Sequence, residues 1–199
     1  MIQGNRDFSL QLSIFKGISH PNIVKMLAVE ITDDFLYVAI EKGQSDLQKV
    51  QQKCGAMTNE AEIKRILVMI GQGLNHLQKY KIVHVDLRPS NLKLTGTPNG
   101  VLKLSGFSLA SNFGKADDTY QAPEGYSGQS DMWSLGIILV ELVFGRTEML
   151  NVAKSAKISL NYNVAFFLKL PDRPKISDHL TDIITSLLEW NSDYRMTRK

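Results

Sequence analysis

The segment Ser130 to Phe144 is apolar on almost every side of a helical wheel. It carries Glu141, and it is far too short to span a bilayer, which takes about 20 apolar residues. In a water-soluble chain, a helix that is apolar all round must be buried on all sides. The sequence therefore predicts a helix over this range at the centre of a helical lobe, ended by Gly145.

Further helices are predicted around this one. After the cap candidates Asn59 and Glu62, apolar residues recur at steps of three and four, namely Ile63, Ile66, Leu67, Ile70, Leu74 and Leu77. The range Ser177 to Trp190 repeats this amphipathic pattern. A capping-box sequence at Ser45 to Gln48 predicts a shorter helix as far as Lys53. Near the amino terminus, Leu12 to Phe15 fit a helix better than a strand.

Strands are few. Four short apolar runs predict two antiparallel hairpins: Asn22 to Glu30 with Asp34 to Glu41, and Leu92 to Thr95 with Val101 to Leu104. A Pro and an Asn-Gly pair mark the turn of the second hairpin. The order of these elements predicts an α+β fold that is mainly helical, with strands gathered toward its amino-terminal side.

Composition excludes several classes of protein. The chain has 199 residues with 23 basic and 20 acidic side chains, and its net charge of +3 is scattered, so nucleic-acid binding is not expected. Cys54 is the single cysteine, which excludes a disulfide framework and favours a reducing compartment. The amino terminus has no apolar signal segment. We expect an intracellular, cytoplasmic protein without a membrane span.

One polar loop carries candidate chemistry: His84-Val85-Asp86-Leu87-Arg88-Pro89-Ser90-Asn91. It resembles the catalytic loop of protein kinases, whose pattern is His-Arg-Asp-Leu-Lys-Pro-x-Asn. Phosphoryl transfer needs a carboxylate that accepts the hydroxyl proton, an amide oxygen for a metal ion, and a cation near the phosphoryl group. The resemblance assigns these roles to Asp86, Asn91 and Arg88. The alternative for Asp86 is structural, as a loop carboxylate that hydrogen-bonds its neighbours and shapes the turn.

Other stretches resemble the kinase pattern in the same order along the chain. They are His20 to Val24 after the αC helix, Leu36 to Glu41 entering the hinge, Ala122-Pro123-Glu124 ending the activation segment, Asp131 to Gly136 opening the αF helix, and Arg195. The resemblance implies that Asp131 caps amides of the catalytic loop and that Glu124 and Arg195 form a buried ion pair. It also implies a core stack of Phe15, Met26, His84 and Phe107.

The family's organisation implies two parts. Residues 1–41 resemble a remnant of the amino-terminal lobe, with the αC helix and one hairpin but without the first three strands. Residues 42–199 resemble the mainly helical carboxy-terminal lobe. The glycine-rich loop and the strand lysine that hold ATP phosphates have no counterpart here, and the position of the αC glutamate falls on Gln11. Backbone groups of Glu41, Lys42 and Gly43 would form the hinge that contacts adenine.

The sequence departs from the kinase pattern at residues that bind metal and phosphate. Gly106-Phe107-Ser108 replaces Asp-Phe-Gly, so the metal loses its main carboxylate and Asn91 is the only ligand that the resemblance leaves. The arginine before the catalytic aspartate is Val85. Thr119 and Tyr120 are weak candidates for phosphorylation. Binding of ATP with Mg²⁺ is therefore expected to be weak or absent.

These departures favour a pseudokinase, a catalytically impaired kinase-like domain. We expect it to bind a protein partner, for example an active kinase, and to scaffold or regulate that partner. One alternative is a low-activity or atypical Ser/Thr kinase that uses Asp86. Another is a truncated gene product without an independent role. The open edge of the first hairpin needs cover from a partner strand or from further amino-terminal residues.

Overall fold

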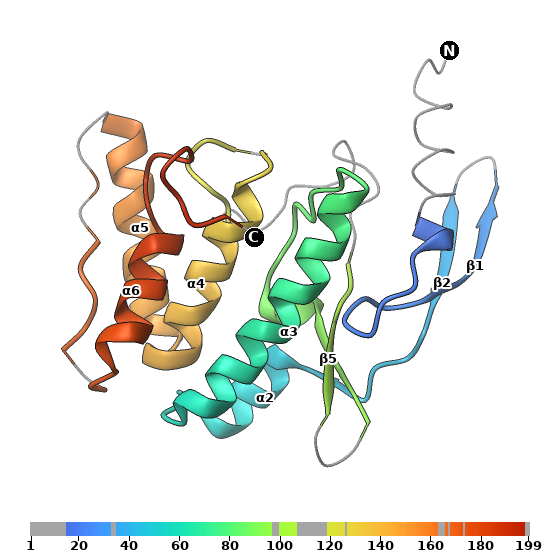
Figure 1. The fold of residues 1–199 in the computed structure, drawn as a ribbon, viewed down its shortest axis with the longest axis horizontal. Coiled ribbons are helices and arrows are strands. Elements are labelled where there is room, and N and C mark those ends of the chain that lie inside the picture. The colour runs from blue at the N-terminus through green and yellow to red at the C-terminus, as the bar shows by residue number, and fades with distance from the viewer. Residues whose placement is uncertain are drawn as a thin grey trace.

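The segment that is apolar on all sides forms helix α4 (Ser130–Phe144). Each of its residues as far as Val143 is buried. Helices α5 (Arg146–Tyr162) and α6 (Asp178–Leu187) pack against it (Figure 1). Gly145 follows the helix at a φ of 90°, and its amide donates to the carbonyl oxygen of Glu141 at 3.0 Å. The predicted helix and its end are confirmed.

The computed structural model describes residues 15–32, 35–96, 100–106, 119–125, 127–162, 166, 168–172 and 174–197. The remaining elements are β1 (Met26–Ile31), β2 (Leu36–Ile40), β3 (Ser45–Asp46), α2 (Leu47–Cys54), α3 (Glu60–Lys79), the 3₁₀ turn η1 (Pro89–Asn91), β4 (Leu92–Thr95) and β5 (Val101–Leu104). Strands β3, β4 and β5 form one antiparallel sheet, and β1 and β2 form another. The α+β fold with mainly helical content is confirmed.

Helix α3 begins as its sequence predicts. The side chain of Asn59 accepts hydrogen bonds from the amides of Ala61 and Glu62, which satisfies amides that have no partner within the helix. The apolar face of α3 packs against strand β5. This approach is close at Gly73, where a Cβ atom would lie 2.7 Å from Cδ1 of Leu104. A side chain at this position would separate the helix from the sheet.

The first predicted hairpin is present, but it begins later than expected. Residues 22–24 precede β1 and bind strand β5 instead: the amide of Val24 donates to the oxygen of Leu104 at 2.9 Å, and Asn22 Nδ2 donates to the oxygen of Leu102 at 2.9 Å. This attachment to β5 competes with pairing to β2 and explains the difference. Within the hairpin, Val29 pairs with Val38.

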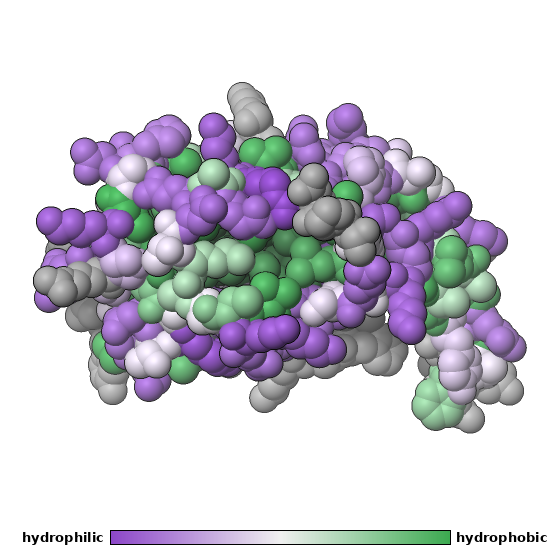
Figure 2. Space-filling view, turned by 90° about the horizontal axis from the view of Figure 1, so that it is seen from below, coloured by the Kyte–Doolittle hydropathy of each residue, from purple (hydrophilic) through white to green (hydrophobic). Residues whose placement is uncertain are grey.

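The β1–β2 hairpin lies to one side of the helices and exposes much of its apolar surface (Figure 1, Figure 2). Its exposed large apolar side chains are Leu27, Ile31, Phe35, Tyr37, Val38 and Ile40. Isolated two-stranded ribbons are marginally stable in water. The hairpin therefore depends on its attachment to β5 through residues 22–24.

Two helix boundaries differ from the sequence expectation. Asp46, not Ser45, caps α2, because Ser45 pairs with Leu94 in the sheet and the Asp46 carboxylate accepts from the amide of Lys49 at 3.0 Å. Helix α6 ends at Leu187 instead of continuing to Trp190. Of the amino-terminal helix, residues 15–17 are helical, and the rest, with Gln11, lies outside the described residues.

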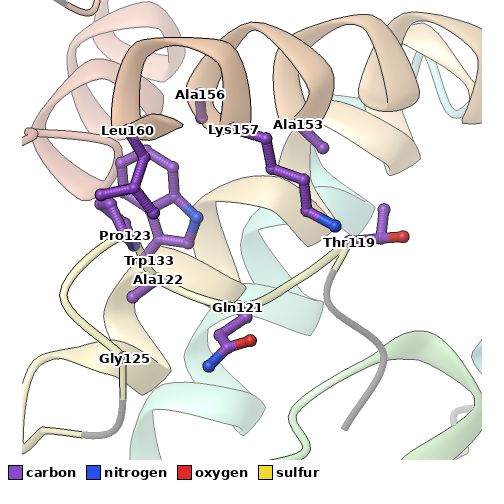
Figure 3. Close-up of a pocket in the computed structure, with 10 residues that line it drawn as sticks. All are labelled: Thr119, Gln121, Ala122, Pro123, Gly125, Trp133, Ala153, Ala156, Lys157 and Leu160. Carbon is purple, nitrogen blue, oxygen red and sulfur yellow. The ribbon is translucent and has the colours of Figure 1, made fainter. Parts of the chain in front are cut away.

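Helix α5 is an element whose bounds the sequence pattern did not predict. Its inward residues Met149, Val152, Ala153 and Ala156 are buried. Ala153 and Ala156 also line a cavity between α5 and α4 (Figure 3). Two of these four residues are alanines, and the buried Ser159 continues the same face, so the stripe is only weakly apolar in the sequence. No helix in the described part of the chain is long and apolar enough to cross a membrane.

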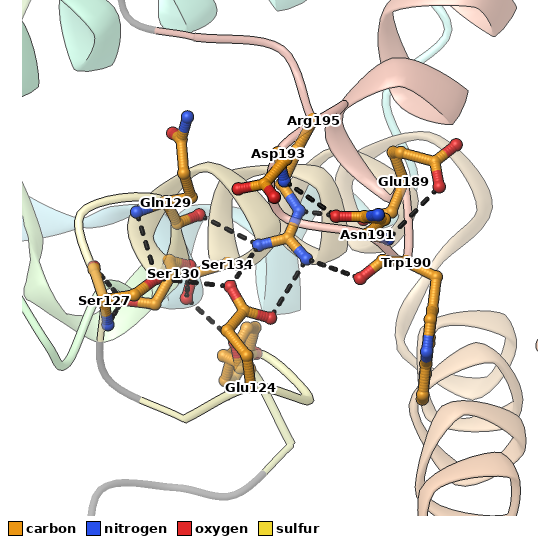
Figure 4. A network of polar contacts seen from close by, with 11 residues as sticks. Glu124, Ser127, Gln129, Ser130, Ser134, Glu189, Trp190, Asn191, Asp193 and Arg195 are labelled. Carbon is orange, nitrogen blue, oxygen red and sulfur yellow. Dashed lines mark hydrogen bonds and ion pairs between the residues drawn. The ribbon is translucent and has the colours of Figure 1, made fainter. Parts of the chain in front are cut away.

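The predicted ion pair of Glu124 and Arg195 fixes the carboxy-terminal segment to the start of α4 (Figure 4). Arg195 Nη1 donates to Glu124 Oε1 at 2.5 Å and to the oxygen of Gln129 at 3.1 Å, while Nη2 donates to Glu124 Oε2 at 3.0 Å. The guanidinium also lies 5.1 Å from the ring centroid of Trp133. The Arg195 side chain is fully buried, so this bidentate pair is a structural bond.

Replacing Arg195 with Met should therefore destabilise the fold by about 3 kcal/mol, because it leaves the Glu124 carboxylate without its partner. Urea denaturation at pH 7 measures this loss. Arg65→Met is the matched control, since Arg65 also pairs with a carboxylate, Glu62, but both side chains are more than a third exposed. Its loss should be about 1 kcal/mol or less. Equal losses in the two variants would contradict the structural role of Arg195.

Candidate functional site

The loop that carries the candidate catalytic residues is held by one carboxylate. Asp131, in the first turn of α4, accepts hydrogen bonds from the amide of His84 at 2.9 Å and from the amide of Val85 at 3.1 Å. Asp131 is only 1% exposed. Val85 has a φ of 71°, which is strained for a β-branched residue and persists only where surrounding contacts enforce it. The Asp131 carboxylate supplies such contacts.

Asp86, Arg88 and Asn91 are brought together, as the motif predicts. Asn91 Nδ2 donates to the backbone oxygen of Asp86 at 2.8 Å and to its Oδ2 at 2.8 Å. Arg88 Nε lies 3.3 Å from Asp86 Oδ1. Both carboxylate oxygens of Asp86 thus contact neighbours in the loop. This is the geometry expected of the structural alternative, in which Asp86 shapes the turn.

Gly106 stands where the kinase pattern has its metal-binding aspartate, and it lies directly against Asn91. The amide of Ser105 donates to the backbone oxygen of Asn91 at 2.8 Å, which holds the two segments together. Gly106 has a φ of 73°, and a Cβ atom there would overlap the Asn91 side-chain amide, with Nδ2 at 2.6 Å. The Asn91 amide therefore occupies the space that a side chain at position 106 would need.

This arrangement does not fit a magnesium ion bound to ATP phosphates. Such a site uses carboxylate oxygens together with an amide oxygen, but position 106 offers no carboxylate. The described residues contain no group of three or more His, Cys, Asp or Glu side chains that could hold a metal ion. Asn91 alone is an insufficient set of ligands.

The predicted hinge residues contact the sheet formed by β3, β4 and β5. The carboxylate of Glu41 accepts from Lys103 Nζ at 2.7 Å and from the amide of Lys25 at 2.8 Å. A Cβ atom on Gly43 would lie 3.0 Å from Cβ of Lys93, so β4 approaches the hinge closely. Lys42 is exposed. The adenine-binding role of these residues stays a prediction.

Charge at Glu41 is stabilised by its partners. Partial burial alone would raise the pKa of Glu41, but hydrogen bonds from Lys103 and from the Lys25 amide outweigh it and hold the pKa below its ordinary value. The carboxylate is therefore ionised at neutral pH and links the hinge to β5.

His84 is a core residue. It is 1% exposed, and burial lowers its pKa although the carboxylates of Asp131 and Asp86 oppose this shift. The imidazole is therefore neutral at pH 7. Phe15 is also buried and Met26 is partly buried. Phe107 lies outside the described residues, so the predicted stack stays a prediction.

A buried polar group on α4 was not identified from the sequence. The hydroxyl of Tyr120 donates to Glu141 Oε2 at 2.5 Å, and Arg146 Nη1 donates to Glu141 Oε1 at 3.2 Å. Burial and the bond to Glu141 raise the pKa of the Tyr120 hydroxyl. Tyr120 is 5% exposed, which argues against phosphorylation there. Glu141 inside an apolar helix was the available signal, since a buried carboxylate needs partners.

A model of the protein kinase domain matches residues 4–199 of this chain. Cell division control protein 2 homolog 3 of Trypanosoma brucei brucei is 36% identical over 151 residues, and the match covers 68% of this chain and 48% of that protein. The chain thus spans about half the length of the curated relative it matches.

The Glu41 contact predicts a dependence of stability on pH. Because the folded pKa is lowered, the contact stabilises the fold above the unfolded pKa of about 4.3 and is lost as pH falls through the lower folded value. Lys103→Met should therefore cost about 1 kcal/mol at pH 7 and progressively less below about pH 4. Urea denaturation of both proteins between pH 3 and 7 measures this. A difference independent of pH would contradict the role of Glu41.

The contact of Gly106 with Asn91 predicts that adding one methyl group at position 106 strongly destabilises the fold. Gly106→Ala should destabilise the fold by about 3 kcal/mol, because it combines backbone strain with overlap of the Asn91 amide. Gly125→Ala is the matched control: Gly125 has a φ of 81° but nothing within 4 Å of a Cβ atom. It should cost about 1 kcal/mol. Equal losses in chemical denaturation would show that Asn91 does not fill this space.

Proposed function

The chain belongs to the protein kinase family, and we propose that it is a catalytically impaired member, a pseudokinase that acts by binding another protein. The observation that supports this most is the packing of the Asn91 amide against Gly106. Catalysis in this family depends on positioning and on electrostatic stabilisation of phosphoryl charge, to which the metal ion contributes strongly. A site without the metal-binding carboxylate lacks that contribution.

The remaining catalytic-loop groups do not compensate for this loss. Asp86 could serve as a general base, which contributes roughly 10²- to 10⁴-fold, whereas enzymes accelerate reactions by about 10⁶-fold or more. Its carboxylate is also bonded to Asn91 and close to Arg88. By contrast, the residues that hold the fold, Asp131, Glu124 and Arg195, keep their family contacts.

A protein-binding role is supported by the exposed apolar surface of the β1–β2 hairpin. Figure 2 shows apolar side chains at the end of the molecule where this hairpin lies. Contiguous exposed apolar surface is typical of protein interaction sites. We propose a protein partner, for example an active kinase that the domain scaffolds or inhibits. The exposed single cysteine, Cys54, fits a reducing compartment such as the cytoplasm.

A second candidate function is an atypical Ser/Thr kinase of low activity. The observation in its favour is the proximity of Asp86, Arg88 and Asn91 in one loop. This function needs a nucleotide held without a carboxylate at position 106, and it makes Asp86 essential for phosphate transfer.

ATP binding separates the two candidates. The purified chain is titrated with ATP, with and without Mg²⁺ or Mn²⁺, and its melting temperature is followed. A ligand at 100 times its Kd would stabilise the fold by about 2.7 kcal/mol. The pseudokinase predicts a cooperative melt without a shift, and equal background phosphate incorporation by the protein and by Asp86→Asn. A metal-dependent rise in melting temperature, with incorporation lost in Asp86→Asn, would reject the pseudokinase and support the atypical kinase.

A further inference from the structure

Residues 20–24 connect the β1–β2 hairpin to the rest of the fold through Asn22, which is 3% exposed. Asn22 Nδ2 donates to the oxygen of Leu102, and the Asn22 oxygen accepts from the amide of Leu104 at 2.9 Å. Helix α3 covers the same residue closely, since a Cβ atom on Gly73 would lie 2.9 Å from the Asn22 oxygen. A change in the hydrogen bonds of Asn22 therefore acts on the segment that holds the hairpin.

The backbone amide of Asn22 depends on a titratable acceptor. It donates to His20 Nδ1 at 3.1 Å. Nδ1 can accept only while it carries no proton, because an imidazolium is a donor at both ring nitrogens. A proton on the His20 ring therefore replaces this acceptor with a second donor that faces the Asn22 amide. The amide of a buried residue then loses its partner, which destabilises this arrangement.

The surroundings of His20 disfavour that proton at neutral pH. Its ring lies against the ring of His76 on α3, with 4.7 Å between the centroids and a tilt of 32°. Burial, and then the charges of His76 and Lys79, lower the pKa of His20 below its ordinary value. Strand β5 contacts the segment through backbone groups of Leu102 and Leu104, which do not titrate. His20 is therefore neutral at pH 7 and accepts from Asn22.

The charged and titratable groups around His20 in the described part of the chain are basic. Helix α3 contributes His76 and Lys79, and the turn before His20 contributes Lys16, which is exposed. His76 Nε2 is buried without a hydrogen-bond partner among the described residues, so the two rings stack and are not joined by a hydrogen bond. An imidazolium at His20 thus gains no carboxylate partner from these groups.

We propose that His20 is a pH-sensitive switch for the attachment of the hairpin. In mildly acidic solution its ring takes up a proton, residues 20–24 leave β5 and α3, and the β1–β2 hairpin is released while the helical core stays folded. Histidine is suited to such a switch because its ordinary pKa lies close to neutral pH. The switch regulates binding of a partner to the apolar hairpin surface, a consequence that rests on the proposed function. The switch itself does not depend on that function.

A lowered pKa makes the attachment weaker in acid. The attachment is at full strength above the ordinary histidine value of about 6.5, and it is lost as pH falls through the lower folded value of His20. The second attachment, between Glu41 and Lys103, keeps its charges over this range. Although burial opposes the shift, hydrogen bonds from Lys103 and the Lys25 amide hold the pKa of Glu41 below its ordinary value. A loss of attachment between pH 7.5 and 5 is therefore not due to Glu41.

Relaxation-dispersion NMR of the full ¹⁵N-labelled chain measures the population of the released hairpin, because the method detects minor states that exchange on the μs–ms timescale. Between pH 7.5 and 5, this population should rise about fivefold in the amides of β1 and β2, the factor expected for the loss of one hydrogen bond. The amides of α4 should show no such rise. A hairpin population that does not rise, or an equal rise in α4, would overturn the proposal.

The variant His20→Asn separates the titration from the hydrogen bond. An asparagine side chain accepts from the backbone amide two residues on and does not titrate. The hairpin should therefore stay attached at pH 5, with the wild-type population at pH 7.5. His179→Asn is the matched control, because His179 is exposed on α6, and it should keep the wild-type rise. Equal rises in His20→Asn and in the wild-type chain would contradict the role of His20.

A measurement on the wild-type chain covers the case in which a variant misfolds. The ring resonances of His20 and the amide resonance of Asn22 should titrate with one midpoint, below about 6.5, because the proton and the hydrogen bond exclude each other. Two different midpoints would also overturn the switch. Neither readout uses ATP or a partner protein, so failure of the switch is distinguishable from failure of the proposed function.

Discussion

The carboxylate of Asp131 joins the buried helix α4 to the loop in which Val85 has a positive φ. Helix α4 is fixed by apolar packing on all sides, and the two amide bonds from His84 and Val85 transfer this fixed position to the loop that carries Asp86. At the same end of the helix, the backbone oxygen of Gln129 accepts a hydrogen bond from Arg195. The start of α4 therefore positions both the catalytic-loop segment and the carboxy-terminal segment.

The kinase-like loop has become a closed polar network. Asn91 bonds the carboxylate of Asp86 and fills the space beside Gly106, so the groups that would face a metal ion in an active kinase satisfy one another. Such a network stabilises one conformation, because the hydrogen bonds among its members hold their side chains in fixed positions. Retention of the loop is thus compatible with a purely structural role.

The sequence predicted those helices and strands that are determined by residues close together in the chain. Helix α4 and strands β4 and β5 were placed at their observed bounds, because apolar periodicity and a Gly or Asn-Gly turn determine them. The binding of Asn22 to β5 and the strand pairing of Ser45 depend on distant residues and were not predictable from local pattern. The same holds for the site: the motif identified Asp86, Arg88 and Asn91, but the direction of the Asn91 amide depends on its contact with Gly106.

The attachment of the β1–β2 hairpin has a kinetic consequence. Its described links to the sheet are the bonds of residues 22–24 to β5 and the contact of Glu41 with Lys103, whereas the helices share one continuous core. Elements held by few contacts open without global unfolding. We expect the hairpin to be a separate cooperative unit whose amide protons exchange with solvent far sooner than those of α3 and α4. A partner that binds the hairpin would therefore slow the exchange of its amide protons selectively.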